Sequence, residues 1–299
     1  MSLFCLSASC SWADGHGPAF GYGTTVLGAG DSSVGTALMW RSGVAMVGPL
    51  FSYGLTSNVQ LSFSAPFDVN YGEHPTGRFT AMMPGVPEAE LLCAWRFQHH
   101  STGVGTRFES TLYGGTSLST QLPPRADGPP LRRAPGVYAG AATGHISRRY
   151  YAWAGVGFER YATVERLDHQ SSTLLGSLVL GWRPPWWEKE YPKSDLRFFW
   201  ESTGERDGQA WRSVAAPVGT GHDGEVVSLP SAGPTGIITL PNSGGRGVYS
   251  GPSFLYTFRS IAFQGGVLFA LWRDPNGVQT ADKIRAVVGI TYFFLGGRK

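Results

Sequence analysis

Apolar and polar residues alternate with a period of two through most of this 299-residue chain. The last such stretch, residues 284–294, places apolar side chains and two terminal aromatics on one face, with Arg285 among mainly smaller residues on the other. Successive side chains of a β-strand point to opposite faces, so the pattern predicts a strand. An apolar face that ends in aromatic residues, backed by an arginine, is typical of a strand between lipid and a wet lumen.

The same alternation, broken by turn signals, recurs along the chain and predicts about twelve strands. Each expected strand has an apolar row on one face and a more polar row on the other. In chain order the strands are expected at residues 35–41, in a run that ends at residue 55, and at 59–64, 90–97, 107–112, 137–146, 150–161, 174–183, 196–203, 248–258, 261–272 and 284–294.

The connections between these strands mostly alternate between short and long. Bacterial outer-membrane barrels have an even strand number, both termini in the periplasm, short periplasmic turns and longer outer loops. Two connections depart from this alternation: residues 42–43 are short where an outer loop is expected, and residues 184–194 are long where a periplasmic turn is expected. The short turns are expected at residues 56–57, 99–102, 147–149 and 259–260, and the longest outer loops at 116–135 and 206–246.

The expected fold class is therefore all-β: a transmembrane antiparallel up-and-down β-barrel of about 12 strands in the bacterial outer membrane. A soluble lipocalin or sandwich also alternates, but its apolar face points inward. Here the charged residues share faces opposite the aromatic rows, which indicates a polar interior and an apolar exterior. The expected lumen-lining residues are Arg41, Glu90, Arg96, Arg107, Glu109, Arg183, Arg197, Glu201 and Arg285.

Two interpretations of these lumenal charges remain open. Rings of charge can form an electrostatic constriction in a pore. Alternatively, the charges pair with one another, fill a bore of modest width and hold the barrel rigid. Both can apply to the same barrel.

Composition narrows the function classes. Only 15% of residues are charged, against about 25% in a typical soluble domain. No run of 18 or more apolar residues occurs, which excludes a helical membrane span. The basic residues are nearly all arginine and form no run longer than a pair, so nucleic-acid binding has little support.

The N-terminal region is expected to divide into three parts. Residues 1–13 resemble the end of a signal peptide, with Ser11-Trp12-Ala13 as a small-x-small cleavage site. Its positively charged start is missing, so the first residue given can lie inside a longer signal, and lipid modification of Cys10 is an alternative. Residues 14–33 are glycine-rich and form either a plug in the lumen or a flexible periplasmic tail. The barrel is expected over residues 34–295, with a tail at 296–299.

Catalytic and metal-binding signals are poor. No Gly-x-Ser-x-Gly elbow occurs, and the Gly28-Ala29-Gly30 run lacks the third glycine and the βαβ setting of a dinucleotide site. The seven histidines are scattered and the three cysteines show no metal or redox spacing. We therefore expect no enzyme activity, no cofactor and no metal.

Several short sequence segments resemble those of the meta-pathway phenol-degradation family of outer-membrane β-barrel transporters. They are residues 48–58, residues 195–205 ending in Glu-Ser-Thr-Gly-Glu, residues 251–256, and residues 262–280 with Arg-Asp-Pro-Asn-Gly-Val-Gln. The likeness covers most of the chain from about residue 48. It implies a monomeric barrel of about twelve strands that passes hydrophobic or aromatic compounds.

The closing strand also resembles the signal that the barrel-assembly machinery recognises, because Gly289, Tyr292 and Phe294 have the Gly-x-x-Tyr-x-Phe spacing of that signal. It departs from that signal because five residues follow Phe294 and Val287 stands at a position expected to be polar. The expected partners are outer-membrane lipid, a small hydrophobic solute and the assembly machinery, with no nucleic acid. The expected function is a channel or facilitator for small solutes; the alternative is an occluded barrel that is structural or binds partners through its loops.

Overall fold

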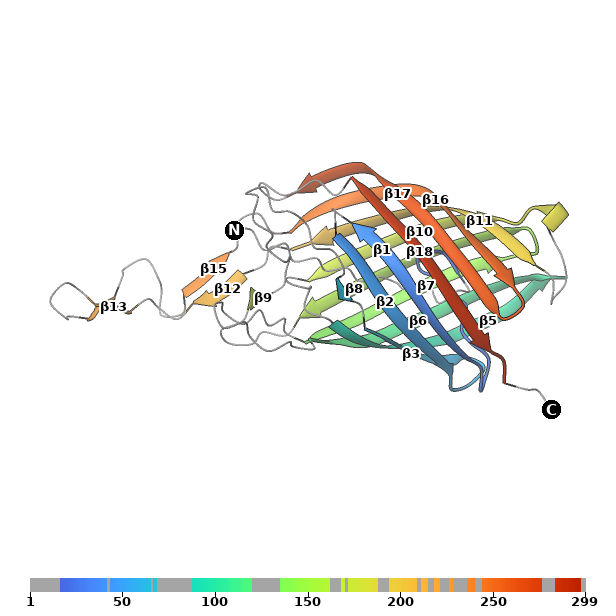
Figure 1. The fold of residues 1–299 in the computed structure, drawn as a ribbon, viewed down its shortest axis with the longest axis horizontal. Coiled ribbons are helices and arrows are strands. Elements are labelled where there is room, and N and C mark those ends of the chain that lie inside the picture. Colours follow the sequence, from blue (N-terminus) through green and yellow to red (C-terminus); the bar gives the residue numbers. More distant parts are fainter. Residues whose placement is uncertain are drawn as a thin grey trace.

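Twelve long antiparallel strands form a closed barrel in the computed structural model (Figure 1). Besides the barrel, the structure contains six short strands and a 3₁₀ turn (Pro185–Trp187). The structure describes residues 17–41, 44–65, 67–68, 88–119, 135–161, 168–169, 172–187, 194–208, 211–214, 218–220, 226–228, 236–239, 244–275 and 283–296.

The barrel strands correspond one for one to the twelve expected from the alternation. They are β1 (Ser32–Arg41), β2 (Val44–Gly54), β3 (Val59–Ser64), β5 (Glu88–Gly103), β6 (Thr106–Ser119), β7 (Gly136–Ile146), β8 (Tyr150–Tyr161), β10 (Thr173–Trp182), β11 (Asp195–Asp207), β16 (Gly245–Phe258), β17 (Ile261–Pro275) and β18 (Ile284–Phe294).

The first and last strands close the barrel. β1 pairs with β2 on one side and with β18 on the other, in a register that runs from Ser32 opposite Phe294 to Arg41 opposite Arg285. Among the described residues, every barrel strand thus pairs with a neighbour on each side, which closes the sheet on itself. Among the described residues, no helix is long and apolar enough to cross a membrane.

The inside-outside assignment made from the alternation is confirmed. On β18 the outward Val288 is 66% exposed, whereas the inward Val287 is 3% exposed. On β11 the adjacent Phe198 and Phe199 are 44% and 4% exposed. An exposed apolar surface of this kind is stable only against lipid, so the outer face of the barrel is its membrane face.

The two ends of the barrel differ. Short connections follow β2, β5, β7 and β16, and because the strands are antiparallel these lie at the same end as the C-terminus; we call this the turn end (Figure 1). The short strands β12 (Trp211–Val214), β13 (Val218–Thr220) and β15 (Gly236–Thr239) lie beyond the opposite, loop end. The remaining short strands are β4 (Phe67–Asp68), β9 (Asp168–His169) and β14 (Val226–Ser228).

One predicted turn is misplaced. β5 continues to Gly103, so the turn to β6 lies at Val104-Gly105 and not at residues 99–102. The polar run that ends β5 has no apolar alternation, but it pairs along β6 with two register shifts. Backbone pairing therefore extends the strand beyond its apolar part.

The interior is less polar than the sequence pattern predicts. One cluster of buried apolar side chains lies on the inner wall between β7 and β18, with Tyr151, Trp153 and Phe199 in mutual ring contact. Leu27, which precedes the first strand, belongs to the same cluster. These side chains are shielded from water because they pack against each other and against Leu27, which lies inside the barrel.

Candidate functional site: the barrel lumen

The glycine-rich residues 17–31, here called the N-terminal segment, lie inside the barrel. The Tyr22 N–H donates to Ser177 Oγ on β10 (3.0 Å), and the Leu27 N–H donates to Gln60 Oε1 on β3 (2.8 Å). At the turn end, the Gly30 N–H donates to the Gly54 carbonyl at 2.9 Å. A Cβ on Gly54 would collide with the Gly28 carbonyl, so this crossing requires glycine. The segment is thus bound to several strands of the wall.

Glu201 holds the start of this segment. Its carboxylate accepts backbone N–H groups from Ala19 (2.7 Å), Phe20 (2.8 Å) and Gly21 (2.7 Å), and a hydroxyl hydrogen bond from Ser253 on β16. Glu201 is 0% exposed. The segment has no charged side chain at this point, so its successive amides satisfy the buried carboxylate.

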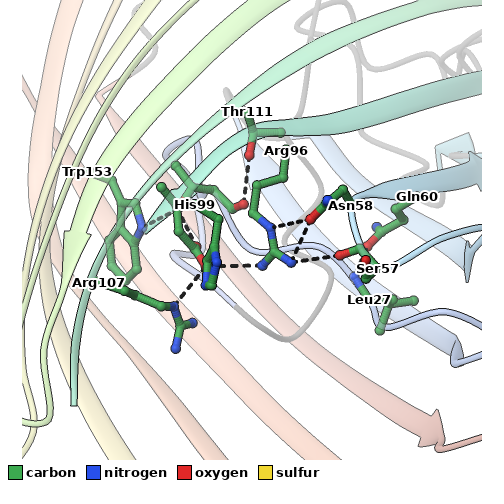
Figure 2. Close-up of polar contacts among 11 residues, drawn as sticks. Leu27, Ser57, Asn58, Gln60, Arg96, His99, Arg107, Thr111 and Trp153 are labelled. Atoms are coloured by element: carbon green, nitrogen blue, oxygen red, sulfur yellow. Dashed lines mark hydrogen bonds and ion pairs between the residues drawn. The ribbon is translucent and has the colours of Figure 1, made fainter. Parts of the chain in front are cut away.

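Glu109, near the start of β6, organises a second buried group nearer the turn end, and Figure 2 shows Arg96, Arg107 and Trp153 of this group. Its Oε1 lies 3.1 Å from Arg96 Nη1 and 2.8 Å from Arg107 Nε, and Oε2 accepts a hydrogen bond from Thr24 Oγ1 at 3.1 Å. Trp153 Nε1 donates to the same threonine hydroxyl at 3.1 Å. The network therefore joins β5, β6 and β8 to the N-terminal segment.

Two smaller ion-pair groups also lie among the described residues of the lumen. At the turn end Asp195 pairs with Arg183 (2.6 Å) and with Arg197 (2.7 Å). Further along the barrel Arg285 pairs with Glu205 at 2.5 Å, and its guanidinium carbon lies 3.5 Å from the centroid of the Tyr249 ring.

The structure distributes the residues expected from the sequence among separate groups and not along one ladder. It brings together Arg96, Arg107 and Glu109, and places Arg183 beside Arg197 around Asp195. Glu201 and Arg285 each belong to a different group, and Glu90 accepts a hydrogen bond from Ser64 Oγ at 3.1 Å. The side chain of Arg41 lies outside the described part of the structure.

Sequence reasoning missed several lumenal groups. Asp195 and Glu205 lie on the inner face of β11, in phase with Arg197 and Glu201, so the alternation rule extended by one or two residues would have found them. No local signal marks Tyr22, whose position depends on where the N-terminal segment folds. Tyr22 fits at this position because glycines of β8 face it. A Cβ on Gly155 would lie 2.6 Å from the Tyr22 Cβ, which is closer than two such atoms can approach.

A cavity of about 120 Å³ lies between the N-terminal segment and the wall formed by β2, β3 and β5 to β8. Three tyrosines line it, and the Tyr22 ring lies 6.0 Å from the Tyr113 ring and 6.5 Å from the Tyr138 ring, centroid to centroid. Glu90 and Glu159 also line it, together with leucine, alanine, proline, glycine, serine, threonine and glutamine residues. The described residues contain no group of three or more His, Cys, Asp or Glu side chains that could hold a metal ion.

The described part of the lumen is therefore packed on one side and contains a cavity on the other. The apolar cluster fills the side between β7 and β18, and the N-terminal segment lies against it through Leu27. The cavity remains on the side of β2 to β8. Chemically, this arrangement can hold a small molecule and exclude a large one.

Several solved structures match most of the length of this chain. NanC porin matches 87% of this chain and 98% of its own, with a TM-score of 0.48 and 8% identity. LpxR from Salmonella typhimurium matches 88% and 100% (TM-score 0.40, 11% identity), and OmpT, an outer membrane protein of Vibrio cholerae, matches 88% and 96% (TM-score 0.35, 8% identity). All three identities are 11% or lower and all three TM-scores are below 0.5, so the assignment of a barrel rests on the strand pairing of this chain itself.

No protein-family model matches the chain, and no curated protein sequence matches it. The resemblance to the meta-pathway phenol-degradation family is therefore not confirmed. The broader class is shown: a closed barrel of twelve strands with an apolar exterior is a bacterial outer-membrane protein.

The expectation that the chain is not an enzyme requires correction. The structures that match its barrel include LpxR and OmpT as well as a protein named as a porin. A fold does not by itself fix a function, so the missing catalytic motifs of soluble enzymes do not exclude catalysis on such a barrel.

Proposed function

We propose that this protein is an outer-membrane channel or facilitator for small hydrophobic or aromatic solutes, and that its N-terminal segment limits passage. The observation that carries the proposal is the cavity beside that segment. A lumen filled only for rigidity would have side chains in this space. Instead, three tyrosines, three leucines and smaller residues line a volume next to a chain segment that belongs to no strand.

The mode of attachment of the segment supports gating. It is held by single hydrogen bonds and by packing, not by a continuous strand ladder. Each such bond contributes about 0.5–3 kcal/mol, depending on charge, so the docked segment can separate from the wall without unfolding the barrel. The solute class is supported by the tyrosine-lined cavity and by the family resemblance of the sequence.

A closed structural barrel is the second candidate, and a specific observation favours it. The Glu109 network and the N-terminal segment together occupy the turn-end half of the lumen. If the segment never leaves, a solute that reaches the cavity has no onward path. The barrel then serves as a rigid support for its loops.

Two measurements separate the candidates. In planar bilayers, a gated channel gives a low conductance that rises when residues 17–27 are deleted. In Gram-negative cells, production of the protein raises the uptake of a radiolabelled benzene-sized aromatic solute. A wild-type protein with no conductance and no effect on uptake, together with a deletion variant that stays closed, would reject the channel.

A further inference from the structure

Glu201 differs from the other lumenal carboxylates whose ion pairs are given above. Each of those pairs with at least one arginine; they are Glu109, Asp195 and Glu205. In the described part of the structure, every side-chain partner of Glu201 is an uncharged N–H or O–H group, supplied by the N-terminal segment and by one serine. Residues 17–30 contain no charged side chain, so the docked segment brings no cation to this carboxylate.

The strand positions beside Glu201 are uncharged as well. In the strand register, Glu201 of β11 lies opposite Val179 of β10 and Gly251 of β16. Ser253, two residues beyond Gly251, donates its hydroxyl to the Glu201 carboxylate. Ser177, two residues before Val179, accepts the N–H that follows the three amides bound to Glu201. Three neighbouring strands thus place one carboxylate and two hydroxyl oxygens on the same part of the inner wall.

Gly21 occupies the space beside these oxygens. A Cβ at this position would lie 3.4 Å from Glu201 Oε2 and 3.4 Å from the Ser177 Cβ, and it would collide with the Val179 side chain. Glu201 is 0% exposed in this arrangement. The segment therefore covers the carboxylate, and its amides supply the hydrogen bonds that a buried polar group requires.

Release of the segment changes the charge of the lumen. The amides that bind Glu201 leave with the segment, and solvent takes their place. A glutamate side chain in contact with water is ionised at neutral pH. A fixed negative charge on the wall of a narrow path attracts cations and repels anions. The docked segment therefore masks a charge in addition to occupying space.

We propose that Glu201, Ser177 and Ser253 form a binding site for a small monovalent cation, alkylammonium ions included, which the docked N-terminal segment covers and its release exposes. The carboxylate supplies the charge, and the two serine hydroxyls supply further oxygen acceptors. The inference rests on the proposed function for the release of the segment. It adds the charge class of the solute, because a positively charged solute passes this point more readily than a negatively charged one of equal size.

A thiol placed beside Glu201 tests the site without any need for conductance. Ser177→Cys is introduced into the full chain with its three native cysteines replaced by serine. Gly21→Val is added to release the segment, because a side chain at this position collides with Val179. The thiol is treated with two methanethiosulfonates of similar size, one bearing a quaternary ammonium group and the other a sulfonate group. The measured quantity is the ratio of the two modification rates, cationic over anionic.

The ratio should depend on the charge of Glu201. In the released protein, Glu201→Gln should lower it by about threefold or more, and Glu201→Asp should preserve it within about twofold. Asp274→Asn is the matched control: it also removes one carboxylate, but one that is more than half exposed and paired with Arg246, so the ratio should not change. With the native Gly21, both reagents should react about tenfold more slowly, because the docked segment covers the site.

Two results would overturn the proposal. One is an unchanged ratio in Glu201→Gln, and the other is equal modification rates with and without the docked segment. Heat-modifiable migration in SDS gels verifies that each variant is folded.

Reversal potentials in planar bilayers connect the site to the proposed channel. In a potassium chloride gradient, the permeability of the Gly21→Val protein to K⁺ relative to Cl⁻ should fall by about threefold or more on Glu201→Gln. A thiol ratio that depends on Glu201 in a protein without conductance would retain the site and reject the channel. Conductance whose ion preference, like the thiol ratio, is independent of Glu201 would retain the channel and reject the site.

Discussion

The backbone N–H of Gly21 donates to the Glu201 carboxylate at 2.7 Å, across 180 residues of sequence. The preceding two amides donate to the same carboxylate. A Cβ on Gly21 would collide with the Val179 side chain, so the glycine allows the chain to approach this closely. This contact connects the N-terminal segment to the middle of β11 and is the most concentrated attachment of that segment to the wall.

Replacing Glu201 should release the N-terminal segment. Glu201→Ala removes the three hydrogen bonds that the segment donates to this buried side chain, each worth about 0.5–1.5 kcal/mol, so the docked fraction should fall by at least tenfold. The expected result is a higher conductance in planar bilayers and faster proteolysis within residues 17–31. Ser202→Ala is the control, because Ser202 is the next residue on β11 and pairs with Ser250, not with the segment. Equal conductance in both variants would show that this attachment does not limit passage.

Removing the charge of Glu109 should destabilise the barrel more than removing an exposed ion pair. Glu109→Gln leaves Arg96, 14% exposed at its side chain, without its buried carboxylate, and breaking a buried pair costs about 3–5 kcal/mol. Asp274→Asn disrupts a pair with Arg246 whose side chains are more than half exposed, so it should cost about 0–1 kcal/mol. Urea unfolding followed by tryptophan fluorescence compares the two. Similar losses in both variants would contradict a structural role for the Glu109 network.

A charge on the outer face should be tolerated less at mid-strand than near the aromatic boundary. Leu178 lies in the middle of β10 and is 52% exposed, so Leu178→Arg should cost about 2–4 kcal/mol of insertion free energy. Phe198 lies beside Trp182 near the turn end, with ring centroids 6.3 Å apart, so Phe198→Arg should cost about 0–1 kcal/mol. Folding yield into lipid vesicles is the measurement. A reversed order would mean that these residues do not lie at the depths assigned here.

The inner face of β11 is not uniformly in contact with water. Phe199 points into the lumen, yet it is 4% exposed and contacts the rings of Tyr151 and Trp153. An arginine at that position would have to displace packed aromatic side chains. A lumen-facing position is thus not equivalent to a wet one.

The amino-acid sequence alone determined the strands, their number and the face that each presents to lipid. Alternation with a period of two is a local property: Val287 and Val288 separate into an inner and an outer position because adjacent residues of a strand cannot share a face. The alternation did not predict the full length of β5, because its final polar residues pair with β6 without any apolar pattern.

Only the tertiary structure decided what the lumen contains. Glu109 and Glu201 have the same residue type and the same inward phase, but one meets two arginines and the other meets backbone amides of the N-terminal segment. Likewise, the sequence left residues 14–33 as either a plug or a tail. The partners of an inward side chain come from strands across the barrel and from a segment up to 182 residues away, so closure of the barrel, and not local pattern, determines them.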